Sequence, residues 1–229
     1  MTTSPQIPLL RAGDRLTRAE FERRYAAMPN VKKAELLEGV VHMPSPVRHT
    51  HHGLPHGLLA RWLGDYVRAT PESQLSIGAT LRLVDENEEP QPDLVLFVSP
   101  TKGTAMIDAE GYLVGPPELV VEVAASSAAN DLDQKLRIYL RAGVSEYLVV
   151  RVEAAAVDWF VLRHGTYERL PADPRGILRS EVFPGLWLDG PALLRADDPG
   201  MCAAVQTGVR SAEHAAFCER LARSPSPEP

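Results

Sequence analysis

Cysteine is scarce in this sequence, with two residues among 229. Cys202 and Cys218 both lie close to the C-terminal end and show no spacing typical of a metal-binding motif. So few cysteines exclude a disulfide-rich fold of the kind that small secreted domains use. We therefore expect two free thiols and a cytoplasmic protein, because the cytoplasm keeps thiols reduced.

Long hydrophobic runs are also missing. No apolar stretch approaches the roughly 20 residues that cross a membrane as a helix. Residues 1–10 contain no basic segment followed by an apolar core, so we expect no secretory signal. A membrane is therefore not an expected partner of this chain.

An excess of positive charge is the third feature that the sequence lacks. The formal net charge at pH 7 is −6, whereas proteins that bind nucleic acid tightly usually carry a basic face. This charge argues against tight nonspecific binding to DNA. A bound divalent cation would offset part of the acidic charge, so weak, metal-assisted contact with DNA is compatible with the composition.

The composition that is present is that of a globular protein, with 45% hydrophobic and 24% charged residues. A chain of 229 residues suits one domain with additions at its ends. We expect an N-terminal arm at residues 1–16, a main domain at 17–195 and a helical C-terminal tail at 196–229. The end of that tail, residues 224–229, is rich in Pro and Ser and is predicted to be mobile.

Two short apolar runs each carry a carboxylate. Residues 93–98 open with Asp93, and residues 118–124 contain Glu122. Both runs are rich in β-branched residues and bounded by Pro or Gly, which is typical of buried strands. Burying a carboxylate is costly unless it binds a cation or accepts hydrogen bonds. We therefore expect these two acids to belong to a site.

A lysine is predicted on the apolar face of the helix that follows. Around a helix, Leu132 and Tyr139 lie about +60° and +40° from Lys135, and Ile138 lies about −60° from it. A surface ion pair with Asp131, four residues earlier, is the alternative explanation for this lysine. Two acids with an inward lysine have the composition of a metal-dependent phosphodiesterase centre.

The pattern Pro92-Asp93, then Glu122, then Lys135 resembles the PD-(D/E)XK nuclease superfamily and, more narrowly, the Uma2 family of restriction-endonuclease-like proteins. In the parent superfamily a lysine lies two residues after the glutamate, and here that position is Ala124. The resemblance implies that Lys135 takes the place of this lysine from the helix. It covers residues 17–190 approximately, through segments 34–41, 43–46, 91–93, 118–123, 131–139 and 142–147, in the order of the family.

The resemblance implies both a fold and a metal. The expected fold is α/β, with a restriction-endonuclease-like core and a mixed central β-sheet flanked by helices. The expected cofactor is Mg²⁺, or Mn²⁺, held by Asp93, Glu122 and the backbone carbonyl of Val123. Lys135 would steady the nucleophile or the charge that develops on the phosphate.

Two further residues match the family less strongly. Glu35 lies on the first strand of a hairpin predicted around Glu38-Gly39, and it either borders the metal site or is a solvated acid on an edge strand. His52 is expected near the mouth of the site, where it contacts phosphate or positions a water, or it belongs to an ordinary polar loop. A zinc site is a further possibility for the loop, although no cysteine accompanies its histidines, which are His49, His51, His52 and His56.

The remaining periodicity predicts elements that position the site. An acidic turn at 85–89 is expected to be solvated, and a loop at 102–117 is long enough to form a flap over the site, with Lys102 at the surface. Residues 183–187 are expected to plug the core. We predict helices at 17–28, 56–69 and 128–143, strands at 74–84 and 146–151, and hairpins at 34–43 and 157–170.

The favoured function is therefore a divalent-metal-dependent DNA endonuclease that hydrolyses phosphodiester bonds, with Asp93, Glu122, Lys135, Glu35 and His52 as its catalytic residues. The first alternative is a catalytically silent nuclease fold that serves as a binding or assembly module, either alone or as a homodimer. The acidic net charge and Ala124 favour this alternative. The second alternative is a metal-binding protein centred on the histidine loop.

Overall fold

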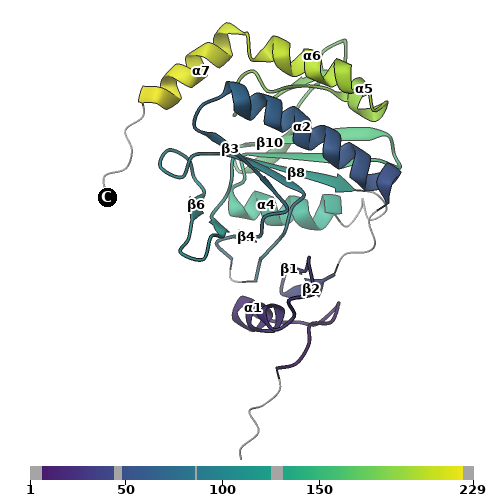
Figure 1. Cartoon of the computed structure of the whole chain (residues 1–229), viewed down its shortest axis with the longest axis vertical. Helices are drawn as coiled ribbons and strands as arrows, with labels where there is room; N and C mark the ends of the chain where they lie inside the picture. Colours follow the sequence, from purple (N-terminus) through teal and green to yellow (C-terminus); the bar gives the residue numbers. More distant parts are fainter. Residues whose placement is uncertain (1–6, 44–47, 86, 125–130, 224–229) are drawn as a thin grey trace, which may run out of the picture.

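A six-stranded mixed β-sheet forms the centre of the molecule, whose computed structural model describes residues 7–43, 48–85, 87–124 and 131–223. Its strand order is β11-β10-β9-β8-β5-β3, and β8 and β9 are its parallel pair. Helices lie on both faces, which confirms the predicted α/β class (Figure 1). The strands are β3 (Ser73–Ile77), β5 (Leu94–Val98), β8 (Leu119–Ala124), β9 (Glu146–Arg151), β10 (Ala156–Arg163) and β11 (Thr166–Arg169).

The parallel pair is joined by a helical crossover, as parallel strands require. Its described part begins with the π-helical turn η2 (Asp131–Lys135) and continues as α4 (Leu136–Ala142). The helix ends at Gly143, whose φ of 84° is a left-handed conformation that favours glycine. The first residues predicted for this helix, 128–130, lie outside the described part of the chain.

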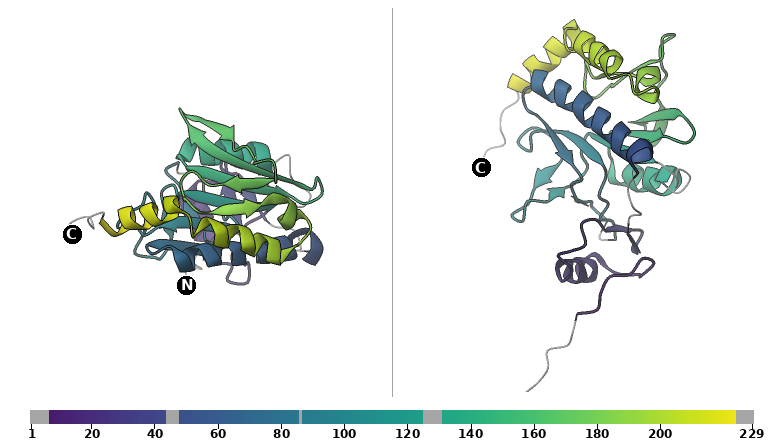
Figure 2. Two further views of the ribbon diagram at one scale, coloured as in Figure 1. Left: turned by 90° about the horizontal axis from the view of Figure 1, so that it is seen from above. Right: turned by 45° about the vertical axis from the view of Figure 1, so that its right-hand side comes forward.

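Alternation along the strands separates two cores. Leu94, Leu96 and Val98 of β5 belong to a core shared with α2 (Leu54–Ala69) and the C-terminal helices. Val95 and Phe97 belong instead to a core shared with α4. Figure 1 and Figure 2 show α2 on one side of the sheet and α4 on the other. By the same alternation, Asp93 and Glu122 belong to the α4 side of β5 and β8.

The N-terminal residues form a separate small layer at the lower end of the molecule in Figure 1. Helix α1 (Arg18–Ala26) starts at Thr17, whose side chain accepts a hydrogen bond from the Glu20 N–H, as the sequence predicts. The predicted hairpin is also present, as β1 (Glu35–Leu37) and β2 (Val40–His42). Its own apolar cluster is formed by Leu10, Phe21, Ala34, Leu36 and Val41. This layer brings the Glu35 end of β1 toward the sheet.

The strand predicted at 74–84 is wrong in its second half. Strand β3 ends at Ile77, because Gly78 has a φ of 63° and turns the chain. The following residues start a separate three-stranded sheet in the order β4-β7-β6. It consists of β4 (Leu81–Arg82), β6 (Met106–Ile107) and β7 (Leu113–Val114).

Residues 102–117 are not one uninterrupted loop, because β6 and β7 lie within them, and their interpretation as a flap over the site stays a prediction. The Thr104 N–H and hydroxyl both donate to the buried carboxylate of Glu118 at 3.1 Å, which fixes the loop. Lys102 is not at the surface: its side chain is 9% exposed and its ammonium donates to the Leu221 carbonyl at 2.7 Å.

The acidic turn at 85–89 is only partly solvated, because Asp85 and Asn87 are exposed as predicted whereas Glu88 and Glu89 are buried. Glu88 and Glu89 are each 2% exposed. Glu88 accepts hydrogen bonds from the Glu38 N–H and from Arg141, while Arg18 donates to the backbone carbonyls of the same turn. Arg18 and Arg141, from two other elements, therefore compensate the negative charge of this turn, which composition alone predicts to be solvated.

The C-terminal residues cover the α2 side of the sheet. Phe183 and Leu186 are fully buried, which confirms the predicted plug. Met201, Val205 and Phe217 from the last helices join the same core. These last elements are β12 (Ile177–Arg179), β13 (Trp187–Asp189), α5 (Gly190–Leu194), α6 (Asp198–Gly208) and α7 (Ala212–Arg223). Within the described ranges no helix is both long and apolar enough to cross a membrane.

Candidate active site

Glu122 is the deepest acid of the site. It lies in the middle of β8 and is 5% exposed. Its Oε1 accepts hydrogen bonds from Lys135 Nζ at 2.7 Å and from the Tyr139 hydroxyl at 3.0 Å. Burial raises the pKa of Glu122 to about 7, with Asp93 and Glu35 adding to the shift and Lys135 opposing it. The positive charge of Lys135 therefore does not fully offset the cost of burying the ionised Glu122 carboxylate.

Asp93 lies just before β5 and is 6% exposed. Its Oδ2 accepts from the Val123 N–H at 2.9 Å and pairs with His52 Nε2 at 3.0 Å, whereas its Oδ1 lies 3.5 Å from Lys33 Nζ. Burial alone would raise its pKa. The bonds to His52 and Val123 and the charge of Lys33 outweigh burial, and hold the pKa of Asp93 well below its usual range. Asp93 is therefore an ionised carboxylate at neutral pH.

Lys135 joins three elements of the site. It ends η2 and is 4% exposed, which confirms that this lysine points inward. Its Nζ lies 3.0 Å from Glu35 Oε1 as well as 2.7 Å from Glu122 Oε1. Glu35 also accepts from the Gln91 N–H at 2.8 Å. Burial would raise the pKa of Glu35, but Lys135 and Lys33 lower it overall. Glu35 is thus part of the acidic cluster rather than a solvated edge acid.

The structure brings all five predicted side chains together and adds two that the sequence analysis missed. Lys33 contacts Asp93, and Tyr139 contacts Glu122. The spacing of Lys33 two residues before Glu35 was a usable signal, since alternate residues of an extended segment share a face. The sequence predicts Tyr139 on the apolar face of the helix because of its ring. Only the packing of the helix shows where its hydroxyl lies.

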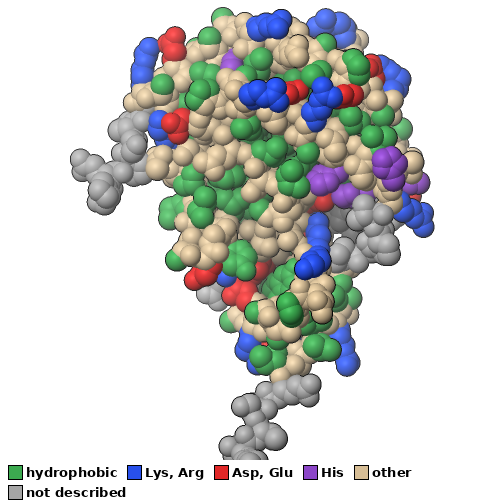
Figure 3. Space-filling view, viewed as in Figure 1, with side chains coloured by type: hydrophobic (Ala, Val, Ile, Leu, Met, Phe, Trp, Pro, Cys, Tyr) green, Lys and Arg blue, Asp and Glu red, His purple; other side chains and the backbone are tan. Residues whose placement is uncertain are grey.

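The histidine loop borders this cluster. The π-helical turn η1 (His49–Gly53) precedes α2, and its His52 reaches the Asp93 carboxylate. His56, in α2, pairs through Nε2 with the Asp93 backbone carbonyl at 3.3 Å. Figure 3 shows histidine side chains gathered on the right-hand side of the molecule in this view. His52 and His56 therefore contribute to the acid site. These two histidines do not form a separate metal centre.

The donor chemistry of the cluster fits a hard cation. The hydrogen-bond donors described for Glu122 both fall on Oε1, and those described for Asp93 both fall on Oδ2. Carboxylate oxygens are the ligands that Mg²⁺ and Mn²⁺ prefer. In the arrangement of the described side chains, no three His, Cys, Asp or Glu residues already form a metal-holding group. Instead, Lys33 and Lys135 form ion pairs with these acids.

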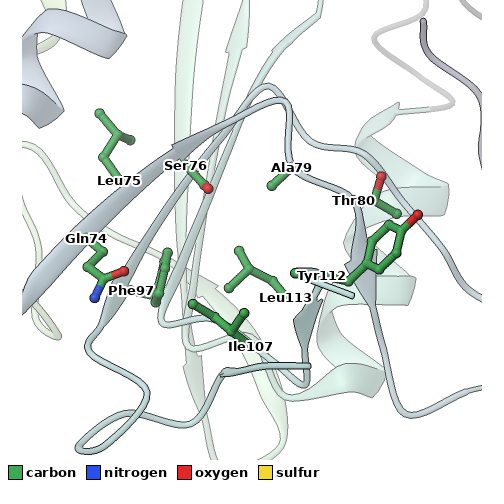
Figure 4. Close-up of a pocket in the computed structure, with 10 residues that line it drawn as sticks. Gln74, Leu75, Ser76, Ala79, Thr80, Phe97, Ile107, Tyr112 and Leu113 are labelled. Atoms are coloured by element: carbon green, nitrogen blue, oxygen red, sulfur yellow. The ribbon is translucent and has the colours of Figure 1, made fainter. Parts of the chain in front are cut away.

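One cavity lies apart from these residues. It has a volume of about 290 Å³ and is formed by residues of β3, β5 and the three-stranded sheet (Figure 4). None of the acids or lysines of the site lines it. Its lining includes Gln74, Ser76, Phe97, Ile107 and Tyr112. This cavity therefore has no part in the chemistry of the acid cluster.

The mixed sheet with helices on both faces and an acid–lysine cluster on one of them is the architecture of a nuclease fold. The chain belongs to the Uma2 family, because residues 18–191 match the family described as "Putative restriction endonuclease". Its fold is similar to a crystal structure from Anabaena variabilis ATCC 29413, described as "a putative nuclease belonging to DUF820". That match has a TM-score of 0.60 and 13% sequence identity, and covers 79% of this chain and 98% of the other. No curated protein matches the sequence.

Proposed function

We propose that this protein is a divalent-metal-dependent endonuclease that hydrolyses phosphodiester bonds in DNA. The observation that carries the proposal is the buried carboxylate of Glu122, paired with Lys135 and lying beside the ionised Asp93. Membership of the Uma2 family supports nuclease chemistry. For structure alone, a pair of apolar side chains would serve as well as these two buried acids.

Asp93 and Glu122, with the backbone carbonyl of Val123, would hold Mg²⁺ or Mn²⁺. When bound, the cation supplies an activated water and positive charge for the phosphate. Lys135 holds Glu122 and Glu35 in place, and its ammonium offsets negative charge that develops on the phosphate.

His52, from η1, holds Oδ2 of Asp93 through its Nε2. Its second ring nitrogen, Nδ1, is buried and has no hydrogen-bond partner among the described residues. Because Nε2 donates to the Asp93 carboxylate, Nδ1 of the neutral ring is an acceptor, so His52 would position a water rather than a phosphate oxygen.

A covalently closed plasmid tests the proposal, because it has no ends for an exonuclease. With Mg²⁺ or Mn²⁺, the protein should convert supercoiled DNA to nicked circles and linear molecules. Asp93→Asn should lower the rate by about 100-fold or more, since stabilisation by a metal is worth several kcal/mol. The exposed Glu153→Gln is the matched control and should cut normally. A wild-type protein that cuts no DNA with either metal would refute the assignment.

One observation favours the alternative of a silent binding module. The position that carries lysine in the parent superfamily is Ala124, and both lysines of the site are already paired with its acids. A silent module would bind a DNA duplex equally well in wild-type and Asp93→Asn forms and would cut neither. The predicted homodimer is tested separately, by the mass of the protein in solution.

A further inference from the structure

The two oxygens of Asp93 have different partners. Oδ2 is held by the Val123 N–H, which belongs to the sheet, and by His52, which reaches it from η1. Oδ1 has a single partner among the described residues, the ammonium of Lys33. A cation that binds Asp93 without breaking these hydrogen bonds must therefore approach Oδ1, where Lys33 stands.

Lys33 is held much more loosely than Lys135. Its Nζ lies 3.5 Å from Oδ1, beyond the 2.7–3.2 Å of a normal N–H···O bond, and its side chain is 29% exposed. Lys135 is 5% exposed and lies 2.7 Å and 3.0 Å from its two carboxylates. A flexible lysine at the mouth of the site is displaced easily, whereas a buried one is not.

We propose that Lys33 occupies, in the metal-free protein, the oxygen of Asp93 that a divalent cation takes, and that it turns to the substrate phosphate once the cation is bound. This inference rests on the proposed function. Lys33 thus acts first as a placeholder at Oδ1 of Asp93, and afterwards as a contact for a DNA phosphate beside the metal. Lys135 stays with Glu122 and Glu35 throughout.

The proposal predicts opposite effects of one substitution. Lys33→Met removes a cation that competes for Oδ1, so Mn²⁺ should bind about tenfold more tightly. The same change removes a phosphate contact, so the KM for plasmid cleavage should rise about tenfold while kcat changes less. A purely structural role for Lys33 would not strengthen metal binding.

The experiment is a calorimetric titration with Mn²⁺ alone, followed by cleavage kinetics on plasmid DNA. Lys32→Met is the matched control, because the neighbouring Lys32 is exposed and its ammonium contacts only the Pro29 carbonyl among the described residues. It should leave both constants unchanged. Lys33→Arg keeps the charge and should restore the metal affinity of the wild type. Thermal melts confirm that each variant is folded.

Each result has a defined meaning. Unchanged or weaker Mn²⁺ binding by Lys33→Met overturns the inference, as does the absence of Mn²⁺ binding by the wild type. An unchanged KM in Lys33→Met, with active wild type, overturns the phosphate contact. If the wild type binds Mn²⁺ but cuts no DNA, the proposed function fails, while tighter binding by Lys33→Met still supports the placeholder role.

Discussion

The side chains of this site illustrate how much a single residue depends on its partners. Asp93 and Glu122 are both nearly buried, yet the pKa of Asp93 is lowered and that of Glu122 is raised to about 7. Burial raises the pKa of both carboxylates. The difference comes from the backbone N–H and imidazole at Asp93, which stabilise its charge more than Lys135 stabilises that of Glu122. The two acids would therefore enter metal binding in different protonation states near pH 7.

Replacing Lys135 with methionine tests its role at the residue scale. Lys135→Met should keep the secondary structure and lose metal-dependent cleavage. It leaves Glu122 and Glu35 without their shared cation, so the pKa of Glu122 rises further above that of the unfolded chain and the lowering of the pKa of Glu35 by Lys135 is lost. Stability then falls as pH rises through that range, and the melting temperature should drop by about 5 °C at pH 8 and by less at pH 6.

Circular dichroism melts at the two pH values, beside the plasmid assay, measure both effects. Lys32→Met serves as the control, since it removes an exposed lysine from the same molecule. Undiminished cleavage by Lys135→Met would show that the lysine of the helix has no part in catalysis.

The sequence located the acids because each interrupts an apolar strand pattern, and it located Lys135 because the helical periodicity points it inward. It did not locate Lys33. The spacing of Lys33 two residues before Glu35 indicates a shared face, but the contact of Lys33 with Asp93 spans 60 residues of sequence between two layers of the molecule. Such contacts depend on the packing of layers, which local patterns do not encode.

At the scale of elements, the joint between α1 and the turn at 85–89 carries an unusual charge arrangement. Burial raises the pKa of Glu89 to about 7, and the neighbouring Glu22 adds to the shift. Arg18, from α1, donates to three carbonyls of the same segment. This joint holds the N-terminal layer, and with it Lys33 and Glu35, against the sheet.

A pH dependence follows from the raised pKa of Glu89. Between pH 4.5 and 7 the unfolded chain loses the proton that the folded joint keeps, so the free energy of unfolding decreases as pH rises through this window. Glu89→Gln cannot ionise. It should therefore be more stable than the wild type by roughly 1–3 kcal/mol at pH 7.5, with little difference at pH 4.5.

Urea unfolding across this pH range measures the difference. Glu153→Gln, an exposed acid, should follow the wild-type curve. If the free energies of unfolding of the wild type and Glu89→Gln changed in parallel with pH, Glu89 would not share or retain a proton in the folded protein.

The same region shows why some elements escaped sequence analysis. A run of five polar or charged residues at 85–89 has the composition of a solvated turn, but Arg18 and Arg141 donate to it from distant elements, and Glu88 and Glu89 are buried. The strand at 74–84 keeps its alternation through Gly78, so periodicity gave no sign of the turn there. The first error concerns tertiary partners, whereas the second is local, because the φ of 63° at Gly78 turns the chain.

At the scale of the whole molecule, the predictions were most accurate. The alternation of buried strands and amphipathic helices, with the ordered family segments, indicated a mixed sheet covered on both faces, and this architecture is present. The net charge of −6 remains consistent with a site that needs a cation before it meets a phosphate. The division into arm, domain and tail remains a prediction, and the end at 224–229 lies outside the described residues.

The central claim is that Asp93 and Glu122 share one divalent cation. The most direct measurement is the anomalous scattering of Mn²⁺ in crystals of the wild-type protein. We predict one peak within about 2.0–2.3 Å of Asp93 Oδ1 and of a Glu122 carboxylate oxygen, with Lys33 moved away from Asp93. A Mn²⁺ ion bound by the histidine loop instead, or no peak between the two acids at saturating Mn²⁺, would contradict the account.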